Sequence, residues 1–586
     1  MEKRLILAIV LIFLVLMGLQ YFFVRRAPVP VSPTAPAAAA PTNPVPGTAG
    51  AIQQRPKTAP AEAKPAPDQP AAPVDLTAVA GQAEKDIVVD TPLYRAVWSN
   101  KGAVLKSWKL KKYQTVSGTS ISWNKLPKLI WAKLKGKGAS PQKESLKEDL
   151  ELVPTLAGEI GRYPFSIGLE DAALMASLNG ALFEASGAGL DLVEGAQGEV
   201  RFVYSDGATV RAEKTFSFTG GSYALKTDVK IWKNGQPVTA SFLWGPGLGN
   251  IAPEETKQSF SASRGSAVYT GGKVIRMNEA KYKAGANAYN FVDWAAYEEN
   301  YFVALFLMPP QRGQAAFLRE SGEVAGGEVQ AHFVYATGPT EAYIGPKDVD
   351  ILKAYGHDAK KVISFGFFGS IAELLLAVVK FCHKLVPNWG VAIILLTLFI
   401  KIIFFPLTYS STKSMAKMAD LAPKIKALNA KYKKAKTDID QRRQKQEEMM
   451  KIYKENGVNP AGGCLPLLIQ LPVFWGVFRM LVVAVEFRHA PFALWITDLS
   501  VRDPLYVTPV LMGITQFISQ KMTPTSADPS QAKMMLIMPF VMTIFFINFQ
   551  SGLVLYWLTT NVLQIGQQAL MNHLMHRHPT TGKARS

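Results

Sequence analysis

The stretch that decides the fold reads GVAIILLTLFIKIIFFPLTY and runs from Gly390 to Tyr409. It is 20 residues long and carries a single charge, Lys401. Because about 20 apolar residues in a helix cross the hydrocarbon core of a bilayer, this stretch predicts a transmembrane helix. At about 1.5 Å per residue, Lys401 would lie about 16 Å from one end and about 12 Å from the other, near the middle of the bilayer.

Further apolar stretches predict five more spans, which makes six in all. They are an N-terminal anchor at 1–26, followed by 463–485, 504–520, 534–549 and 551–571. The last two are divided by Phe549-Gln550-Ser551-Gly552, a turn signal within an apolar run that is too long for one helix. A cleaved signal peptide is the alternative to the anchor, but Arg25-Arg26 follows the apolar run where a small-residue cleavage site would be expected.

Composition separates a linker and a globular domain from these spans. Residues 27–84 form a predicted disordered linker, because 13 of the 38 prolines of the chain fall between Ala27 and Pro73. Residues 85–357 contain no long apolar run, and they alternate apolar and polar residues with a period of two. This period is typical of half-buried strands and predicts a large antiparallel β-sandwich.

Basic residues predict on which side of the membrane each part lies. Residues 411–456 hold 13 Lys and Arg against 6 Asp and Glu, and the tail at 579–586 is also basic. Loops rich in Lys and Arg stay in the cytoplasm. With six spans, both termini are then cytoplasmic and the 85–357 domain lies outside. The net charge of +19 over the 586 residues also favours an anionic partner.

The segment 358–578 is predicted to be the membrane core, with two helical additions to its spans. Residues 370–386 form an amphipathic helix suited to the membrane interface. Residues 411–457 form a cytoplasmic hairpin of two helices that turns near Thr437-Asp438. A solvated hairpin is one interpretation, and the other is a docking arm that binds anionic lipid or ribosomal RNA. The lysines expected to make such contacts are Lys431, Lys433, Lys434 and Lys436.

Polar residues within the spans predict a hydrated groove around Lys401. A cation near mid-depth costs roughly 2.5–3.5 kcal/mol on insertion scales, and the five C-terminal spans contain no Asp or Glu to neutralise it. Most other polar residues fall in the inner halves of the spans, which favours a groove open to the cytoplasm over a channel. The predicted groove residues are Thr397, Lys401, Gln470, Gln516, Tyr556, Trp557, Thr560, Asn561 and Gln564. Hydrogen bonds between helices are the alternative role for them.

Several sequence blocks resemble the YidC membrane-protein insertases, over residues 360–575 nearly continuously. The blocks include Asn388-Trp389-Gly390, Thr397, Lys401, Pro406-Leu407-Thr408, Ser414-Met415-Ala416-Lys417-Met418, NPAGGCLPLLIQ at 459–470, APFALWI at 490–496 and SGLVLY at 551–556. The resemblance implies a six-span protein of the Gram-negative inner membrane with a periplasmic β-sandwich. Its groove would receive hydrophilic parts of nascent membrane proteins. The expected partners are these nascent proteins, the Sec translocon, the ribosome and anionic lipids, with no cofactor.

The sequence departs from the family pattern at two positions. Lys401 stands where the family typically has arginine, and Trp557 where a second tyrosine is common; lysine keeps the charge but not the bidentate fork.

The two cysteines, Cys382 and Cys464, exclude a disulfide framework and a Cys-based zinc site. The sequence contains no Gly-rich loop that ends in Gly-Lys-Ser/Thr, the motif that would indicate an ATPase. We therefore expect a non-enzymatic insertase and chaperone. A solute transporter with an outer receptor domain is the alternative, although the interrupted repeat halves of such proteins are not found.

Overall fold

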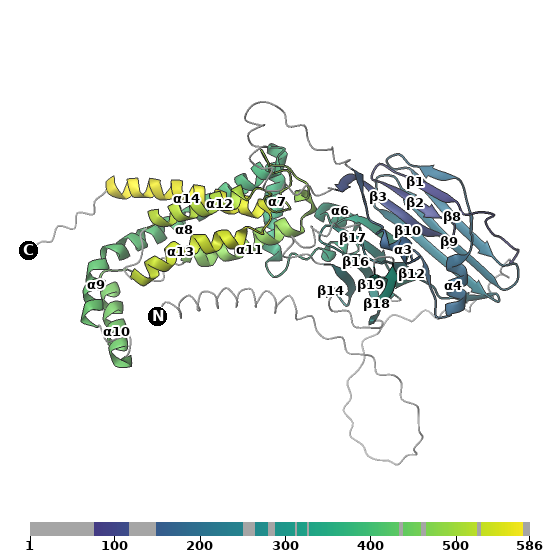
Figure 1. Ribbon diagram of the computed structural model, residues 1–586, viewed down its shortest axis with the longest axis horizontal. Coiled ribbons are helices and arrows are strands. Elements are labelled where there is room, and N and C mark those ends of the chain that lie inside the picture. Colours follow the sequence, from purple (N-terminus) through teal and green to yellow (C-terminus); the bar gives the residue numbers. More distant parts are fainter. Residues whose placement is uncertain are drawn as a thin grey trace, which may run out of the picture.

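The computed structural model has a β-rich part beside an elongated group of helices (Figure 1). The structure describes residues 76–115, 148–249, 264–278, 287–310, 313–324, 327–432, 438–458, 465–523 and 529–577. The predicted anchor, residues 27–75 of the predicted linker and the basic tail lie outside the described residues.

The β-rich part contains three sheets. The largest has ten strands, in the order β14 (Lys273–Asn278), β13 (Gly265–Thr270), β16 (Val292–Glu298), β17 (Phe302–Leu307), β20 (Glu341–Pro346), β10 (Ala224–Lys233), β9 (Val210–Thr219), β8 (Gln197–Ser205) and β6 (Glu184–Ala185), with β11 (Gln236–Val238) paired to β10. One five-stranded sheet has the order β4 (Glu148–Glu151), β3 (Val104–Thr115), β2 (Tyr94–Ser99), β1 (Asp86–Asp90) and β7 (Gly189–Asp191). The other has the order β15 (Asn287–Asn290), β18 (Gln314–Val324), β19 (Gly327–Thr337), β12 (Ser241–Trp244) and β5 (Ile167–Gly168). The pairs are antiparallel, as predicted, except that β1 and β7 run parallel.

The two smaller sheets pack on one face of the largest sheet. The ring of Phe216 in β9 lies 4.1 Å from the ring of Trp98 in β2 and 5.8 Å from the ring of Phe242 in β12, between ring centroids. Alternate residues of β9 and β10 are buried, in agreement with the period-two pattern. Since burying one Phe side chain contributes about 1.5–3 kcal/mol, aromatic packing between the layers stabilises the predicted sandwich.

A buried lysine also joins the layers. Lys214 in β9 is 0 % exposed, and its ammonium donates to the carbonyl oxygens of Gly102 (2.7 Å), Ala103 (3.1 Å) and Phe165 (2.9 Å). Burial lowers the pKa of Lys214 well below its usual value. All three protons of an ammonium are thereby matched with acceptors, which is the condition under which a buried cation is tolerated.

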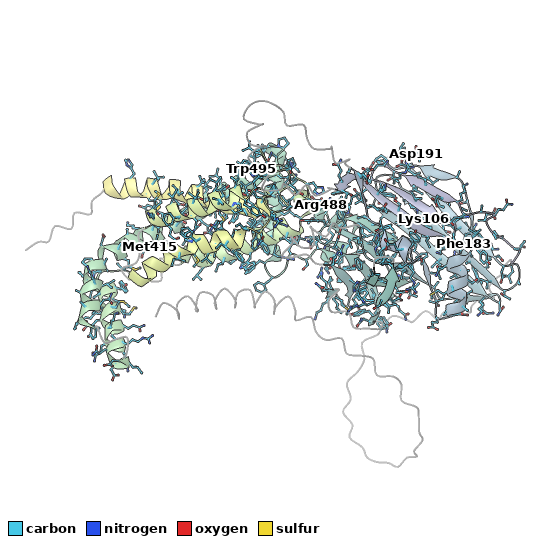
Figure 2. The ribbon with its side chains drawn as sticks, in the orientation of Figure 1. Lys106, Phe183, Asp191, Met415, Arg488 and Trp495 are labelled. Atoms are coloured by element: carbon cyan, nitrogen blue, oxygen red, sulfur yellow. The ribbon has the colours of Figure 1, made fainter. Side chains whose placement is uncertain are left out.

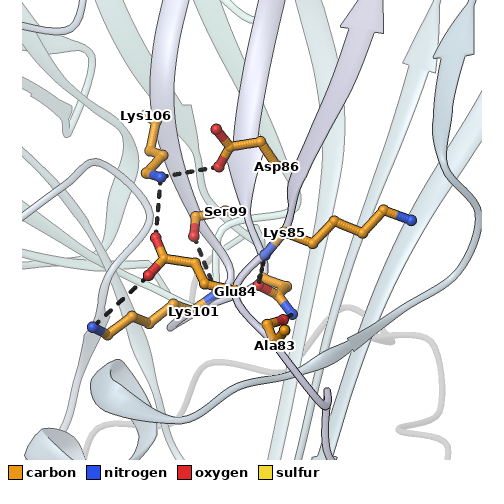
Figure 3. A network of polar contacts seen from close by, with 8 residues as sticks. Ala83, Glu84, Lys85, Asp86, Ser99, Lys101 and Lys106 are labelled. Carbon is orange, nitrogen blue, oxygen red and sulfur yellow. Dashed lines mark hydrogen bonds and ion pairs between the residues drawn. The ribbon is translucent and has the colours of Figure 1, made fainter.

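The ordered β-rich part begins before residue 85, where the predicted linker ends. The backbone N–H of Val79 donates to the carbonyl of Ser205 at 3.0 Å. Figure 3 shows the next attachment, in which the Lys106 ammonium binds the carboxylates of Glu84 (3.1 Å) and Asp86 (2.9 Å). The linker boundary was therefore predicted too late, because these contacts involve distant residues and leave no local pattern in the sequence.

Helices connect and follow the sheets. Short ones are α3 (Leu156–Glu159), α4 (Ala172–Gly180), α6 (Val349–Tyr355) and the 3₁₀ turn η3 (Ala359–Val362). The helical part comprises α7 (Gly369–Leu385), α8 (Trp389–Asp420), α9 (Ala422–Lys431), α10 (Ile439–Glu455), α11 (Leu465–Val483), η6 (Val485–Phe487), α12 (Val507–Met522), α13 (Pro529–Phe546) and α14 (Ser551–Arg577). The predicted interfacial helix and the segments predicted as the five C-terminal spans each overlap one of these helices.

The helix α8 differs from its prediction in length. It continues to Asp420 instead of ending at 409, because after Pro406 it contains no Pro or Gly to end it. Among the described helices, α8 is the one that is long and apolar enough to cross a membrane, and shorter apolar helices cover Leu468–Val483 and Leu536–Phe546. Six spans therefore stay a prediction.

Charged contacts join the β-rich part to the helices. The Lys380 ammonium in α7 binds the carboxylates of Glu486 (2.6 Å) in η6 and Asp350 (2.8 Å) in α6. Arg488 donates to the carbonyl of Gln114 in β3 at 3.1 Å. In Figure 2, Arg488 lies where the two parts meet, whereas Met415 lies at the far end of the helices. These contacts orient the sandwich at one end of the helical part.

Candidate functional site

A small pocket lies between α8, α11 and α14 beside Lys401. It is lined by Thr397, Ile400, Lys401, Phe404, Leu407 and Thr408 of α8, by Gln470 of α11, and by Tyr556 and Thr560 of α14. The centres of water molecules can occupy about 20 Å³ of it, and one water needs about 10–15 Å³. The pocket therefore has room for one or two waters.

A neutral amide holds the Lys401 ammonium. The Nζ atom donates to Oε1 of Gln564 in α14 at 2.8 Å. Within the described residues, no Asp or Glu forms an ion pair with Lys401. The charge is therefore positioned by a hydrogen bond without being neutralised. An ammonium has three donors, and the remaining two are free to bind water or an anion in the pocket.

Close packing closes the pocket at the end of α8 that lies nearer the sandwich. A Cβ atom at Gly390 would lie 2.0 Å from the Phe492 ring, so only glycine allows the loop before α12 to pack there. The Asn388 side chain caps α8 by accepting from the N–H of Val391 at 3.0 Å, and it donates to the Phe492 carbonyl at 2.9 Å. The loop and the helix start are thereby held together on the side nearer the sandwich.

The structure brings together six of the nine predicted groove residues. Five line the pocket and Gln564 binds its lysine: Thr397, Lys401, Gln470, Tyr556, Thr560 and Gln564. The other three lie between α12 and α14. The Trp557 indole donates to Oε1 of Gln516 at 3.1 Å, and Nδ2 of Asn561 donates to the Met512 carbonyl at 3.1 Å. These three side chains therefore join helices, the alternative that the sequence left open.

Sequence reasoning also missed four residues that line the pocket. Ile400, Phe404 and Leu407 are apolar and carry no sign of a polar site. Thr408 was recognisable, because it lies seven residues, or about two helical turns, after Lys401 and so shares its face. In the structure its hydroxyl donates to the Phe404 carbonyl at 2.9 Å.

The predicted arm consists of two packed helices, α9 and α10. Leu421, Ile425 and Val458 form a small apolar core between them. Asp438 begins α10 by accepting from the N–H of Asp440 at 2.9 Å, whereas Thr437 of the predicted turn lies outside the described residues. Of the four predicted docking lysines, Lys433, Lys434 and Lys436 lie outside the described residues. The fourth, Lys431, is exposed and forms an ion pair with Glu448 at 2.6 Å.

Family models match both parts of the chain. The model described as "60Kd inner membrane protein" matches residues 381–578, and "YidC periplasmic domain" matches residues 147–378. A relative from Geotalea daltonii named "Membrane protein insertase YidC" is 34% identical, over 98% of this chain and 99% of its own. The chain belongs to the YidC family of membrane protein insertases. Its function as a YidC-type insertase and its place in the inner membrane follow from this membership.

Other YidC proteins extend the comparison. A YidC insertase from Geobacter sp. strain M21 is 36% identical over 83% of this chain and 85% of its own length. The solved structure described as "Active YidC insertase crystal structure with the first transmembrane domain resolved" is 20% identical and covers 84% of this chain and 93% of its own. Its TM-score is 0.34, so family membership rests on the sequences.

Proposed function

We propose that this chain inserts and helps to fold membrane proteins through a hydrophilic groove that opens to the cytoplasm and is centred on Lys401. The observation that carries the proposal is the Lys401 ammonium, held by a neutral amide in a pocket with room for water. Inside a low-dielectric helix bundle, such a cation attracts the acidic part of a client more strongly than it would in water. A tail that enters the pocket has a shorter distance to travel through lipid.

Exposed apolar faces support a six-span arrangement in lipid. On α12 and α13 the exposed large apolar side chains are Val510, Leu511, Ile514, Ile518, Leu536, Ile537, Phe540, Val541 and Ile544. Faces of this kind are stable against hydrocarbon and unfavourable against water. A client helix that leaves the groove sideways would meet the same lipid. Burial of its roughly 20 apolar residues can drive that step without a nucleotide.

The arrangement of the two parts supports the proposed orientation. The arm and the sandwich lie at opposite ends of the helical part (Figure 1). Since the arm is the most basic loop, the positive-inside rule places it in the cytoplasm with both termini, and the sandwich in the periplasm.

Exposed cations on the arm suit ribosomal RNA or anionic lipid as partners. In α9 and α10 these are Lys424, Lys426, Lys431, Arg442, Arg443, Lys451 and Lys454. We include the Sec translocon as a partner from the family resemblance, with insertion proceeding alone or beside it.

The test compares two clients that differ only in the charge of the translocated tail, with insertion measured by protease protection. Lys401→Arg should retain activity because it keeps the charge. Lys401→Ala should impair the client with the acidic tail more than the client with the neutral tail. Equal impairment of both clients would mean that Lys401 hydrates or stabilises the bundle and does not attract the tail.

A further inference from the structure

Gln564 is the residue that accepts a hydrogen bond from the Lys401 ammonium. Its Oε1 atom lies 2.8 Å from the Lys401 Nζ atom, and the contact joins α8 to α14 across 163 positions of sequence. Gln564 lies one helical turn after Thr560, which lines the pocket. It is therefore beside the pocket wall and in direct contact with the cation.

The chemistry of the side chain matters because two groups of nearly the same shape would act differently here. The amide oxygen accepts one of the three ammonium donors and carries no net charge, so the ammonium keeps its full charge and two donors for other partners. A carboxylate at the same position would form an ion pair and cancel the field that an acidic client segment meets. An apolar side chain of equal length would leave the charge intact but would not hold it in place.

We propose that Gln564 is a positioning residue that sets the preference of this insertase for acidic client segments, by holding the Lys401 ammonium without neutralising it. This inference rests on the proposed function of the Lys401 pocket. It concerns the sequence of this chain in particular, in which a lysine with a flexible stem stands at the centre of the pocket. A flexible cation loses more conformational freedom when it binds a carboxylate, and a preformed hydrogen bond reduces that loss.

The experiment measures one ratio, the insertion of an acidic-tailed client divided by that of a matched neutral-tailed client, in full-length protein. Gln564→Glu should lower this ratio to the value of Lys401→Ala, which we expect to be about tenfold below wild type, the change that 1.4 kcal/mol produces. The double variant Lys401→Ala/Gln564→Glu should fall lower still, because its pocket carries an uncompensated negative charge. Gln564→Met should give a value between those of wild type and Lys401→Ala.

The outcomes separate this inference from the function on which it rests. If Lys401→Ala lowers the ratio but Gln564→Glu and Gln564→Met leave it at the wild-type value, Gln564 does not position the charge and the inference is overturned. If Lys401→Ala also leaves the ratio unchanged, the proposed function fails first. Should Gln564→Glu not accumulate in the membrane, Gln564→Met decides: a ratio equal to that of wild type would overturn the inference. A purely structural role would lower the insertion of both clients equally and leave the ratio unchanged.

Discussion

Replacing Lys214 with methionine should destabilise the β-sandwich, because three buried carbonyls would lose their donor. Methionine retains the length and the packing of the lysine stem but cannot donate to Gly102, Ala103 or Phe165. Each buried acceptor left without a partner costs about 1–3 kcal/mol. Burial of the ammonium is itself unfavourable, and it lowers the pKa of Lys214 in the folded protein. Removing the ammonium therefore offsets part of this cost. We therefore expect the free energy of unfolding to fall by about 3 kcal/mol, the lower end of the summed cost for the three acceptors.

Amide hydrogen exchange of β9 in the full-length protein measures this loss. Since about 1.4 kcal/mol changes an equilibrium tenfold, the β9 amides should exchange about 100-fold faster in Lys214→Met. The control is Lys230→Met on the neighbouring strand β10. Lys230 forms an exposed ion pair with Asp228 at 2.7 Å, and such a surface pair contributes about 0–1 kcal/mol. If β9 exchanges at the same rate in both variants, the three hydrogen bonds do not stabilise the sandwich.

Two further predictions concern the loop before α12 and the arm. Burial, with a smaller effect of Arg488, lowers the pKa of His489 to about 3 in the folded protein. In the unfolded chain the pKa of a histidine is about 6.5. The neutral side chain therefore stabilises the fold fully above pH 6.5, and this contribution is lost as the pH falls toward 3. Acidification to about pH 4.5 should cost the wild type about 2–3 kcal/mol more than His489→Asn, and equal changes in melting temperature would contradict this. In the arm, Lys433→Gln, Lys434→Gln and Lys436→Gln together should weaken binding to ribosomes or anionic vesicles, most clearly at low salt. Lys431→Gln alone should weaken it less, because Glu448 already engages that ammonium at 2.6 Å; an equal effect of the single and triple variants would count against the docking role.

Local pattern determined the elements of this protein. The apolar run at 390–409 predicted the helix around Lys401, and α8 contains it. The basic segment after it predicted two helices with a turn near Asp438, and Asp438 is the N-cap residue of α10. Alternation in β10 predicted which of its side chains are buried. Each of these features depends on residues within one or two turns or strand repeats of one another, so their spacing is visible in the sequence.

Contacts between distant segments decided the rest. Thr560 and Gln564 share one face of α14 with Tyr556, and the sequence predicted that they belong to the groove around Lys401. It did not reveal that Gln564 is the residue that accepts from the Lys401 ammonium. Trp557 and Asn561 lie about 100° around the same helix and instead meet α12. Likewise, Lys214 lies on the buried face of β9, and its three acceptors come from two other segments of the chain. A periodic pattern defines the faces of a helix or strand, whereas the identity of the neighbour on each face depends on how whole elements pack, and that is settled only in the tertiary structure.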